Sequence, residues 1–205
     1  METLYVTADL LKNTLSLNGT NFADVDLAML ATTASRTVDN LCNRHFYVDD
    51  DANQVRYYTP DELAGQDIDD LTTLTSFQTD SDGDGSFDQT WTLNSDFILE
   101  DINAQANPAD LWPYVRLTVH PLGQYTLPVS YPRSVKVTGK FGWPVVPDAI
   151  VTATILVATL LLTVQRSAPL GIVAFEGGAI RLARGNPQVM MLVERYEHHR
   201  RVAAA

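Results

Sequence analysis

The chain has 205 residues, 45% of them hydrophobic, and carries a formal net charge of −11 with an isoelectric point near 4.6. That apolar fraction is ordinary for a globular protein and excludes a wholly disordered chain. The net negative charge argues against nonspecific binding of nucleic acid, which needs a basic surface. The single cysteine, Cys42, cannot close an intrachain disulfide and leaves no second soft ligand for a zinc knuckle, which fits a reduced compartment.

Two helices are predicted in the N-terminal part of the chain. Thr7 can cap a first helix that extends to Asn13, and the Asn18-Gly19 pair ends it. Apolar residues then recur at helical spacing over 22–43 without an interrupting glycine or proline, which predicts a second, long helix. The first residues lack the basic flank and apolar core of a signal peptide, so we expect them to belong to the mature protein.

The middle of the chain is rich in β-branched and aromatic residues. Residues 60–70 are predicted to form an acidic loop, and a Gly/Asp loop at 79–86 joins two β-rich runs, which is typical of a hairpin. The predicted strands are 54–59, 71–78, 89–93, 96–100, 114–119 and 134–140. We therefore expect a β-rich middle flanked by helices.

The most apolar helix candidate is 149–164, which contains no charge, glycine or proline. Pro144 and Pro147 set its start, because proline suits the first turn of a helix but not its interior. The polar positions that fall within an arc of about 60° on this helix are Asp148, Thr152, Thr159, Thr163 and Arg166. The uncharged run is shorter than the ~20 residues that a membrane span needs and lacks basic flanks, so we expect a helix buried in a soluble core.

The C-terminal part is predicted to be an arm followed by a helix. The Gly177-Gly178 pair forms a turn between two short apolar runs that have no sizeable face to bury, so we expect this arm to need a neighbour. Asn186-Pro187 supplies an N-cap and a first-turn proline for a final helix over 189–196. The basic residues after it suit the negative pole of the helix dipole.

These elements predict a mainly α fold with a β-rich insertion, of the α+β class. The architecture is a small helical bundle with β-hairpins, an extended C-terminal arm and a terminal helix. The expected divisions are N-terminal core helices at 1–48, the insertion with its acidic hairpin at 49–140, a core helix at 141–170, and the arm and helix at 171–205. They form a single domain plus an arm.

One loop has residues that could hold a metal ion. The aspartates Asp80, Asp82, Asp84 and Asp88 copy the first half of a calcium loop, in which alternating carboxylates converge on a hard cation. The second half fails, because the position that needs a bidentate glutamate is Trp91. Two interpretations stay open: a calcium site, and an acidic hairpin tip that binds no ion. No other cofactor is predicted.

No motif predicts an enzyme. The four histidines lack the spacing of a zinc hydrolase helix. The sequence has no G-x-S-x-G elbow, no phosphate loop and no GxGxxG turn. Twenty-five acidic residues guarantee some carboxylate pairs by chance, so such pairs do not indicate glycosidase-like catalysis.

A resemblance extends this interpretation. The run VTGKFGWP at 137–144 is followed by Val146-Pro147, an Ala-rich helix and the run RSAPLG at 166–171. In this order, the segments resemble the head-tail connector proteins of long-tailed bacteriophages, also called adaptor or head-completion proteins. The N-terminal helices and the acidic hairpin look like those of members from phages of actinobacteria, so the resemblance covers most of the chain. Its specific part is VTGKFGWP; Asn186, where Asp-Pro is commoner, and the His198-His199 pair depart from the pattern.

The resemblance implies a structural virion protein. Subunits of such families form a ring, typically twelvefold, beneath the portal protein, and the ring extends the DNA channel towards a tail-side neck or tail-terminator protein. DNA would pass through the lumen without specific binding, which an acidic ring favours. The expected location is the neck of the virion, after assembly in the host cytoplasm, and no membrane partner is expected.

The resemblance also implies two interfaces. Final helices of such families dock onto the portal, and the implied portal-binding residues are Asn186, Pro187, Met190, Met191, Val193, Glu194, Tyr196, Arg200 and Arg201. The arm at 171–185 would contact a neighbouring subunit through Ile172, Phe175, Ile180 and Arg181. On this view, deleting 186–205 leaves the core folded and stops portal attachment.

Two other classes stay open. A tail-completion protein or another ring protein of the neck would share the helices and differ in its partner. A calcium-binding adhesin or enzyme would need the 80–88 loop to bind metal and a cleft of convergent polar groups, which the sequence does not indicate.

Overall fold

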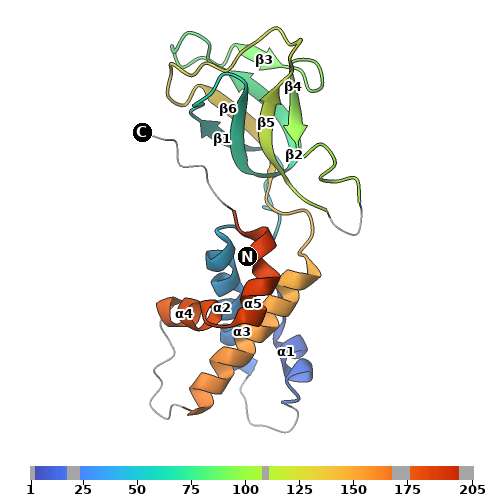
Figure 1. Cartoon of the computed structure of the whole chain (residues 1–205), viewed down its shortest axis with the longest axis vertical. Helices are drawn as coiled ribbons and strands as arrows, with labels where there is room; N and C mark the ends of the chain where they lie inside the picture. Colours follow the sequence, from blue (N-terminus) through green and yellow to red (C-terminus); the bar gives the residue numbers. More distant parts are fainter. Residues whose placement is uncertain (1–2, 18–23, 108–110, 168–175, 199–205) are drawn as a thin grey trace. The chain divides into compact units, whose positions relative to one another are not determined.

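The structure is a computed structural model that describes residues 3–17, 24–107, 111–167 and 176–198. These residues form two compact units (Figure 1). The helical unit comes from the two ends of the chain, within Met1–Phe46 and Val146–Arg201, and the β unit lies within Tyr47–Val145. The predicted α+β class is confirmed: the described residues contain five α-helices and a six-stranded antiparallel sheet.

The helical unit is built around two long helices. Its elements are α1 (Ala8–Thr14), α2 (Asp24–Cys42), α3 (Asp148–Ser167), α4 (Glu176–Arg184), α5 (Pro187–Val193) and a short 3-10 turn, η1 (Glu194–Tyr196). Helix α3 packs against α2, α4 and α5, and α1 packs against α2. As predicted, Thr7 caps α1, because its hydroxyl accepts a hydrogen bond from the Leu10 amide at 3.1 Å.

Helix α3 is the apolar centre of this unit. Its fully buried residues include Ile150, Ala153 and Val157, while Thr152 and Thr163 of the predicted polar stripe are exposed. By length and composition, Asp148–Arg166 is apolar enough to cross a membrane, but core helices of soluble proteins pass the same test. Its packing against three helices is the arrangement expected of a core helix.

The extended C-terminal arm is the part of the predicted fold that is wrong. Residues of the expected Gly177-Gly178 turn lie in helix α4. Ala179 and Ala183 are four residues apart, so they share one face of this helix, and both are buried in the helical unit where α4 packs on α2 and α3. Burial of that face outweighs the low helix propensity of two glycines, which a local pattern cannot anticipate.

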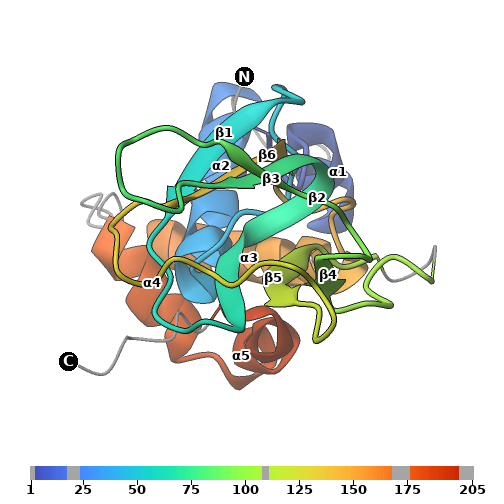
Figure 2. The ribbon, with the colours of Figure 1, turned by 90° about the horizontal axis from the view of Figure 1, so that it is seen from above.

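The β unit is a single antiparallel sheet. Its strands are β1 (Gln54–Tyr58), β2 (Gly65–Thr79), β3 (Gln89–Trp91), β4 (Phe97–Glu100), β5 (Tyr114–Val119) and β6 (Val135–Phe141). The order is β1-β6-β2-β5-β4, with β3 paired to β2, so β1 and β4 lie at opposite edges (Figure 2). Strand β2 pairs with β5 through its first part and with β6 and β3 through its second, with register shifts between Asp67 and Leu71 and further along.

Strand β2 begins six residues earlier than the predicted strand, within the expected acidic loop. Ile68 in this stretch is buried, and the flanking aspartates have partners on other strands. Asp67 forms an ion pair with Arg116 of β5, and Asp69 lies 3.0 Å from Arg56 of β1. The acidic composition of this stretch predicts a loop, but its carboxylates are tolerated in a strand because arginines on other strands neutralise them.

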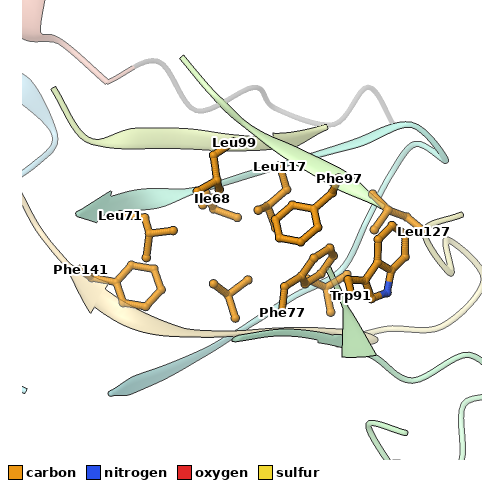
Figure 3. Close-up of a cluster of buried hydrophobic side chains, with 11 residues drawn as sticks. Ile68, Leu71, Phe77, Trp91, Phe97, Leu99, Leu117, Leu127 and Phe141 are labelled. Atoms are coloured by element: carbon orange, nitrogen blue, oxygen red, sulfur yellow. The ribbon is translucent and has the colours of Figure 1, made fainter. Parts of the chain in front are cut away.

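Four aromatic and seven aliphatic side chains form the core of the β unit (Figure 3). The Phe77 ring lies 4.9 Å from the ring of Trp91 and 4.9 Å, edge-on, from that of Phe97. The Trp91 indole N–H donates a 2.8 Å hydrogen bond to the hydroxyl of Thr79, so its one polar atom is satisfied inside the core. Trp91 is thus a core anchor.

The VTGKFGWP run forms β6 and the corner after it, and its glycines are required by close packing. A Cβ on Gly139 would lie 2.4 Å from the Thr73 carbonyl oxygen. Gly142 has φ +111°, and a Cβ there would lie 2.1 Å from the Tyr47 carbonyl oxygen. Trp143 is fully buried, with its ring 4.9 Å from that of Trp112. The most specific segment of the sequence is therefore structural.

Candidate functional site

The first candidate is helix α5 with the η1 turn that follows it, which together carry most of the predicted portal-binding residues. Asn186 caps it as predicted: its side-chain oxygen accepts hydrogen bonds from the amides of Gln188 at 2.9 Å and Val189 at 3.2 Å. Pro187 follows at the first turn, where its missing N–H costs nothing. The start of this helix is set by its own sequence.

Helix α5 and the η1 turn together have two different faces. Val189, Val193 and Tyr196 are buried inside the helical unit, with exposed fractions of 3% or less. We define the α5 outer face as Pro187, Met191 and Glu194, which recur at helical spacing and are exposed. Met191 is 73% exposed, a large value for an apolar side chain. The structure therefore separates the predicted residues: Val193 and Tyr196 pack within the chain, Met190 is half-buried, and the outer face is free to meet a partner.

The end of α5 is tied to the N-terminal part of the chain. The His198 amide donates a 2.8 Å hydrogen bond to the Cys42 carbonyl, and an Arg44 guanidinium nitrogen lies 2.6 Å from His198 Nδ1. The Tyr196 ring meets Phe46 edge-on at 5.8 Å. The expectation that the arm at 171–185 needs a neighbour is wrong for its described residues, 176–185, because the apolar face of α4 is buried in its own unit.

A polar network supports the same corner of the helical unit. The Tyr5 hydroxyl donates to the Asp39 carboxylate and accepts a 2.7 Å hydrogen bond from the Phe46 amide. Burial, together with the neighbouring Asp39 carboxylate, raises the pKa of Tyr5 well above its ordinary value. Burial likewise raises the pKa of the Cys42 thiol to about 12, so the thiol is protonated and unreactive at neutral pH.

The residues expected to contact a neighbouring subunit are only partly visible. On α4, Ile180 is half-buried and Arg181 is exposed. Ile172, Phe175, Arg200 and Arg201 lie outside the described residues.

The second candidate is the acidic loop between β2 and β3. Carboxylate oxygens of Asp80, Asp82 and Asp84 lie within 4.8 Å of one another, but Asp88 is not part of this group. Asp80 is 5% exposed and accepts hydrogen bonds from the amides of Gly83 at 2.7 Å and Gly85 at 2.8 Å. Desolvation opposes its ionisation, but these amide hydrogen bonds prevail and lower the pKa of Asp80 below its ordinary value.

The hydrogen bonds of Asp80 explain the loop without a cation, because they satisfy its carboxylate and hold the turn. Gly83 and Gly85 have φ of +80° and +90°, so the turn uses conformations that suit glycine. Calcium binding stays a prediction, which calorimetry at millimolar calcium tests. The sequence pattern located this cluster correctly but did not separate Asp88 from it.

The third feature is a pair of lysines on β6 to which the sequence pattern assigned no role. Lys136 and Lys140 lie on β6 together with Thr138, on the side opposite the buried Val135 and Val137. The strict alternation of SVKVTGK already indicates an outward-facing lysine pair. What the pattern could not supply is which residues of neighbouring strands share this side.

Comparisons with known proteins support a shared fold. No family model matches the chain, and no curated protein sequence matches it at a significant level. Among solved structures, the fold is similar to that of a chain in the neck of an empty GTA particle, a structure computed with C6 symmetry. The likeness covers 100% of this chain and 96% of that chain, with a TM-score of 0.52 and 17% sequence identity. At that identity it establishes the fold alone.

Proposed function

We propose that this protein is a structural component of the neck of a phage-like particle, where it serves as the head-to-tail adaptor. The observation that carries the proposal is the likeness to a chain from the neck of a GTA particle, which spans both units of this chain from end to end. The resemblance of VTGKFGWP to adaptor proteins of long-tailed phages points in the same direction from the sequence side.

In this proposal, copies of the chain form a ring beneath the portal protein. The ring extends the DNA channel, and its other side provides the attachment surface for a tail-side neck or tail-terminator protein. The neck of the GTA particle was computed with C6 symmetry, which supports a symmetric ring of subunits for this chain as well. The finished protein resides in the virion after assembly in the host cytoplasm.

We assign portal contact to the α5 outer face. Pro187, Met191 and Glu194 are exposed, whereas the other side of the helix is buried in the chain's own core. An exposed methionine suits a protein interface, because its flexible side chain adapts to the opposing surface. Arg200 and Arg201, which the resemblance also implies for portal binding, follow α5 and η1 in the sequence and lie outside the described residues.

The test is cryo-electron microscopy and co-sedimentation of the full chain with portal protein. We expect a ring bound to the portal, and we expect Met191→Asp to abolish binding while leaving the chain folded. The matched control is Met29→Asp, because Met29 is a similarly exposed methionine, 63% accessible, on a different helix. Equal binding by both variants would contradict the assignment of α5.

A second experiment distinguishes the adaptor from another ring protein of the neck. The chain is tested by pull-down with portal protein and, separately, with tail-tube proteins. Binding to portal supports the adaptor role. Binding to tail-tube proteins alone would make the chain a tail-completion protein and overturn the adaptor proposal.

A further inference from the structure

The basic residues of the β unit are divided into two groups by their surroundings. The unit contains five of them, and two are neutralised: Arg56 lies 3.3 Å from Asp49 and 3.0 Å from Asp69, and Arg116 pairs with Glu62 and Asp67. The other three, Arg133, Lys136 and Lys140, form no ion pair among the described residues. The unit is strongly acidic, so most cations could find a carboxylate partner, and three cations that form no ion pair are unusual.

These three cations lie together. Lys136 and Lys140 are on β6, four residues apart, which separates their Cα atoms by about 13 Å along the strand. Arg133 comes just before β6, and its guanidinium lies 4.9 Å from the ring centre of Tyr57. Tyr57 is opposite Lys136 in the β1 and β6 pairing, so all three cations border the same side of the sheet.

The register of the sheet defines what else this side presents. Residues directly opposite each other on paired strands point to the same face. We name the resulting set the outer sheet face, which consists of Val55, Tyr57, Thr73, Ser76, Gln78, Lys136, Thr138 and Lys140. It contains two cations, four side-chain hydroxyl groups and no carboxylate, and its one amide, that of Gln78, already donates to the Phe87 carbonyl and to the Thr90 hydroxyl.

We propose that the outer sheet face contacts the phosphate backbone of duplex DNA. This inference rests on the proposed function, in which DNA passes along the ring formed by the chain. Lysine and arginine supply most of the affinity for phosphates, and serine and threonine side chains commonly donate further hydrogen bonds to phosphate oxygens. Charge complementarity favours DNA over an apolar partner, because the centre of this face is polar.

The acidic loop limits the strength of this contact. Phe87 at the end of the loop packs on the outer sheet face, with its ring 5.5 Å from that of Tyr57 and 5.5 Å from the Lys136 ammonium nitrogen. Phe87 therefore joins to this face a loop that carries the exposed carboxylates of Asp82 and Asp84, and the exposed Asp88 follows Phe87 directly in the chain. A cationic face beside an acidic loop gives weak, salt-sensitive binding without base recognition, which suits DNA that must keep moving.

The test is NMR titration of the uniformly ¹⁵N-labelled full chain with a short DNA duplex at about 10 mM ionic strength, where the Debye length is about 30 Å. We expect amide shift changes confined to β1, β6 and the second half of β2. If Arg133, Lys136 and Lys140 each contact one phosphate, the slope of log K against log salt concentration should be about −2.7. Absence of shifts under these conditions, or shifts confined to the helical unit, would overturn the proposal.

Charge variants sharpen the result. Lys136→Glu and Lys140→Glu should each weaken binding and make the salt slope shallower by about 1. Arg184→Glu, which makes the same charge change at an exposed position on α4, should leave both unchanged. Asp82→Asn with Asp84→Asn should strengthen binding. Equal effects of Lys140→Glu and Arg184→Glu would show that only net charge matters, and would overturn the assignment of this face.

Sedimentation of the same samples separates this inference from other outcomes. Salt-sensitive self-association that Lys140→Glu abolishes, without DNA-induced shifts, would assign the face to an acidic surface of a second copy and not to DNA. A wild-type chain that binds DNA through the outer sheet face but never joins the portal would contradict the proposed function. It would still support the assignment of this face to DNA. A Lys140→Glu chain that still joins the portal but loses DNA binding supports both.

Discussion

The backbone amide of His198 donates a 2.8 Å hydrogen bond to the carbonyl oxygen of Cys42, the last residue of α2. This contact joins residues more than 150 positions apart and makes the C-terminal helix part of the same core as the N-terminal helices. It has a direct consequence for truncation. Removing 186–205 should unfold or loosen the helical unit, contrary to the expectation from the sequence that the core would stay intact.

Substitution of Tyr196 tests this directly. Tyr196→Ala should lower the free energy of unfolding by about 3–5 kcal/mol, the usual cost of truncating a buried aromatic side chain. Tyr196 is 3% exposed and contacts Phe46 edge-on, so its loss leaves a cavity in the core. Urea denaturation followed by circular dichroism measures the change.

The control for this variant is Met191→Ala on the exposed side of α5, the helix that directly precedes η1 and Tyr196. Met191 is 73% exposed, so the free energy of unfolding should change by less than about 0.5 kcal/mol. If both variants had equally small effects, α5 would not be packed on the helical unit.

The reactivity of Cys42 reports on the same packing. Cys42 is fully buried, and burial raises the pKa of its thiol to about 12, so alkylation of the native protein near pH 8 should be very slow. The Val193 carbonyl oxygen lies 4.0 Å from its sulfur, so deletion of 186–205 should make the thiol react much faster. Mass spectrometry of iodoacetamide adducts over time, with urea-unfolded protein as the reference, provides the measurement.

Among the glycines that the structure describes, Gly142 should be the most sensitive to substitution. Gly142→Ala should cost about 2–4 kcal/mol, because φ of +111° disfavours a side chain and the new Cβ would collide with the Tyr47 carbonyl oxygen. Thermal or urea unfolding detects the loss.

Gly178→Ala is the matched control. Apart from its chain neighbours and the nearby backbone of its own helix, α4, no heavy atom lies within 4 Å of a Cβ at this position. The substitution should therefore stabilise the chain by about 0.5–1 kcal/mol, the helix-propensity difference between alanine and glycine. A destabilised Gly178→Ala chain would argue for the extended arm that the sequence pattern suggested.

The acidic loop should make the β unit sensitive to low pH. The pKa of Asp80 is lowered in the folded state, so its stabilising contribution is complete above the pKa of the unfolded carboxyl group, about 3.9. That contribution is lost as the pH falls from there through the lower folded value. Urea unfolding at a series of pH values below about 5 should show this slope, and Asp80→Asn should flatten it. An unchanged slope in the variant would place the acid sensitivity elsewhere.

Local signals in the sequence predicted several elements well. The Asn186-Pro187 start of α5 and the Thr7 cap of α1 were found because each hydrogen bond joins residues only two or three positions apart. The Gly/Asp loop was found for the same reason. The first part of β2 was missed because its carboxylates are neutralised by Arg56 and Arg116, which come from other strands.

By itself, the sequence determined the α+β class, the apolar centre at α3, the caps and turns, and the location of the acidic loop. These depend on periodicity and on contacts between near neighbours, which a linear pattern contains. Only the tertiary structure decided that 176–198 belongs to the core, and that three cations without carboxylate partners share one side of the sheet. Both facts come from contacts between residues far apart in the chain, where burial and strand register, and not local propensity, set the outcome.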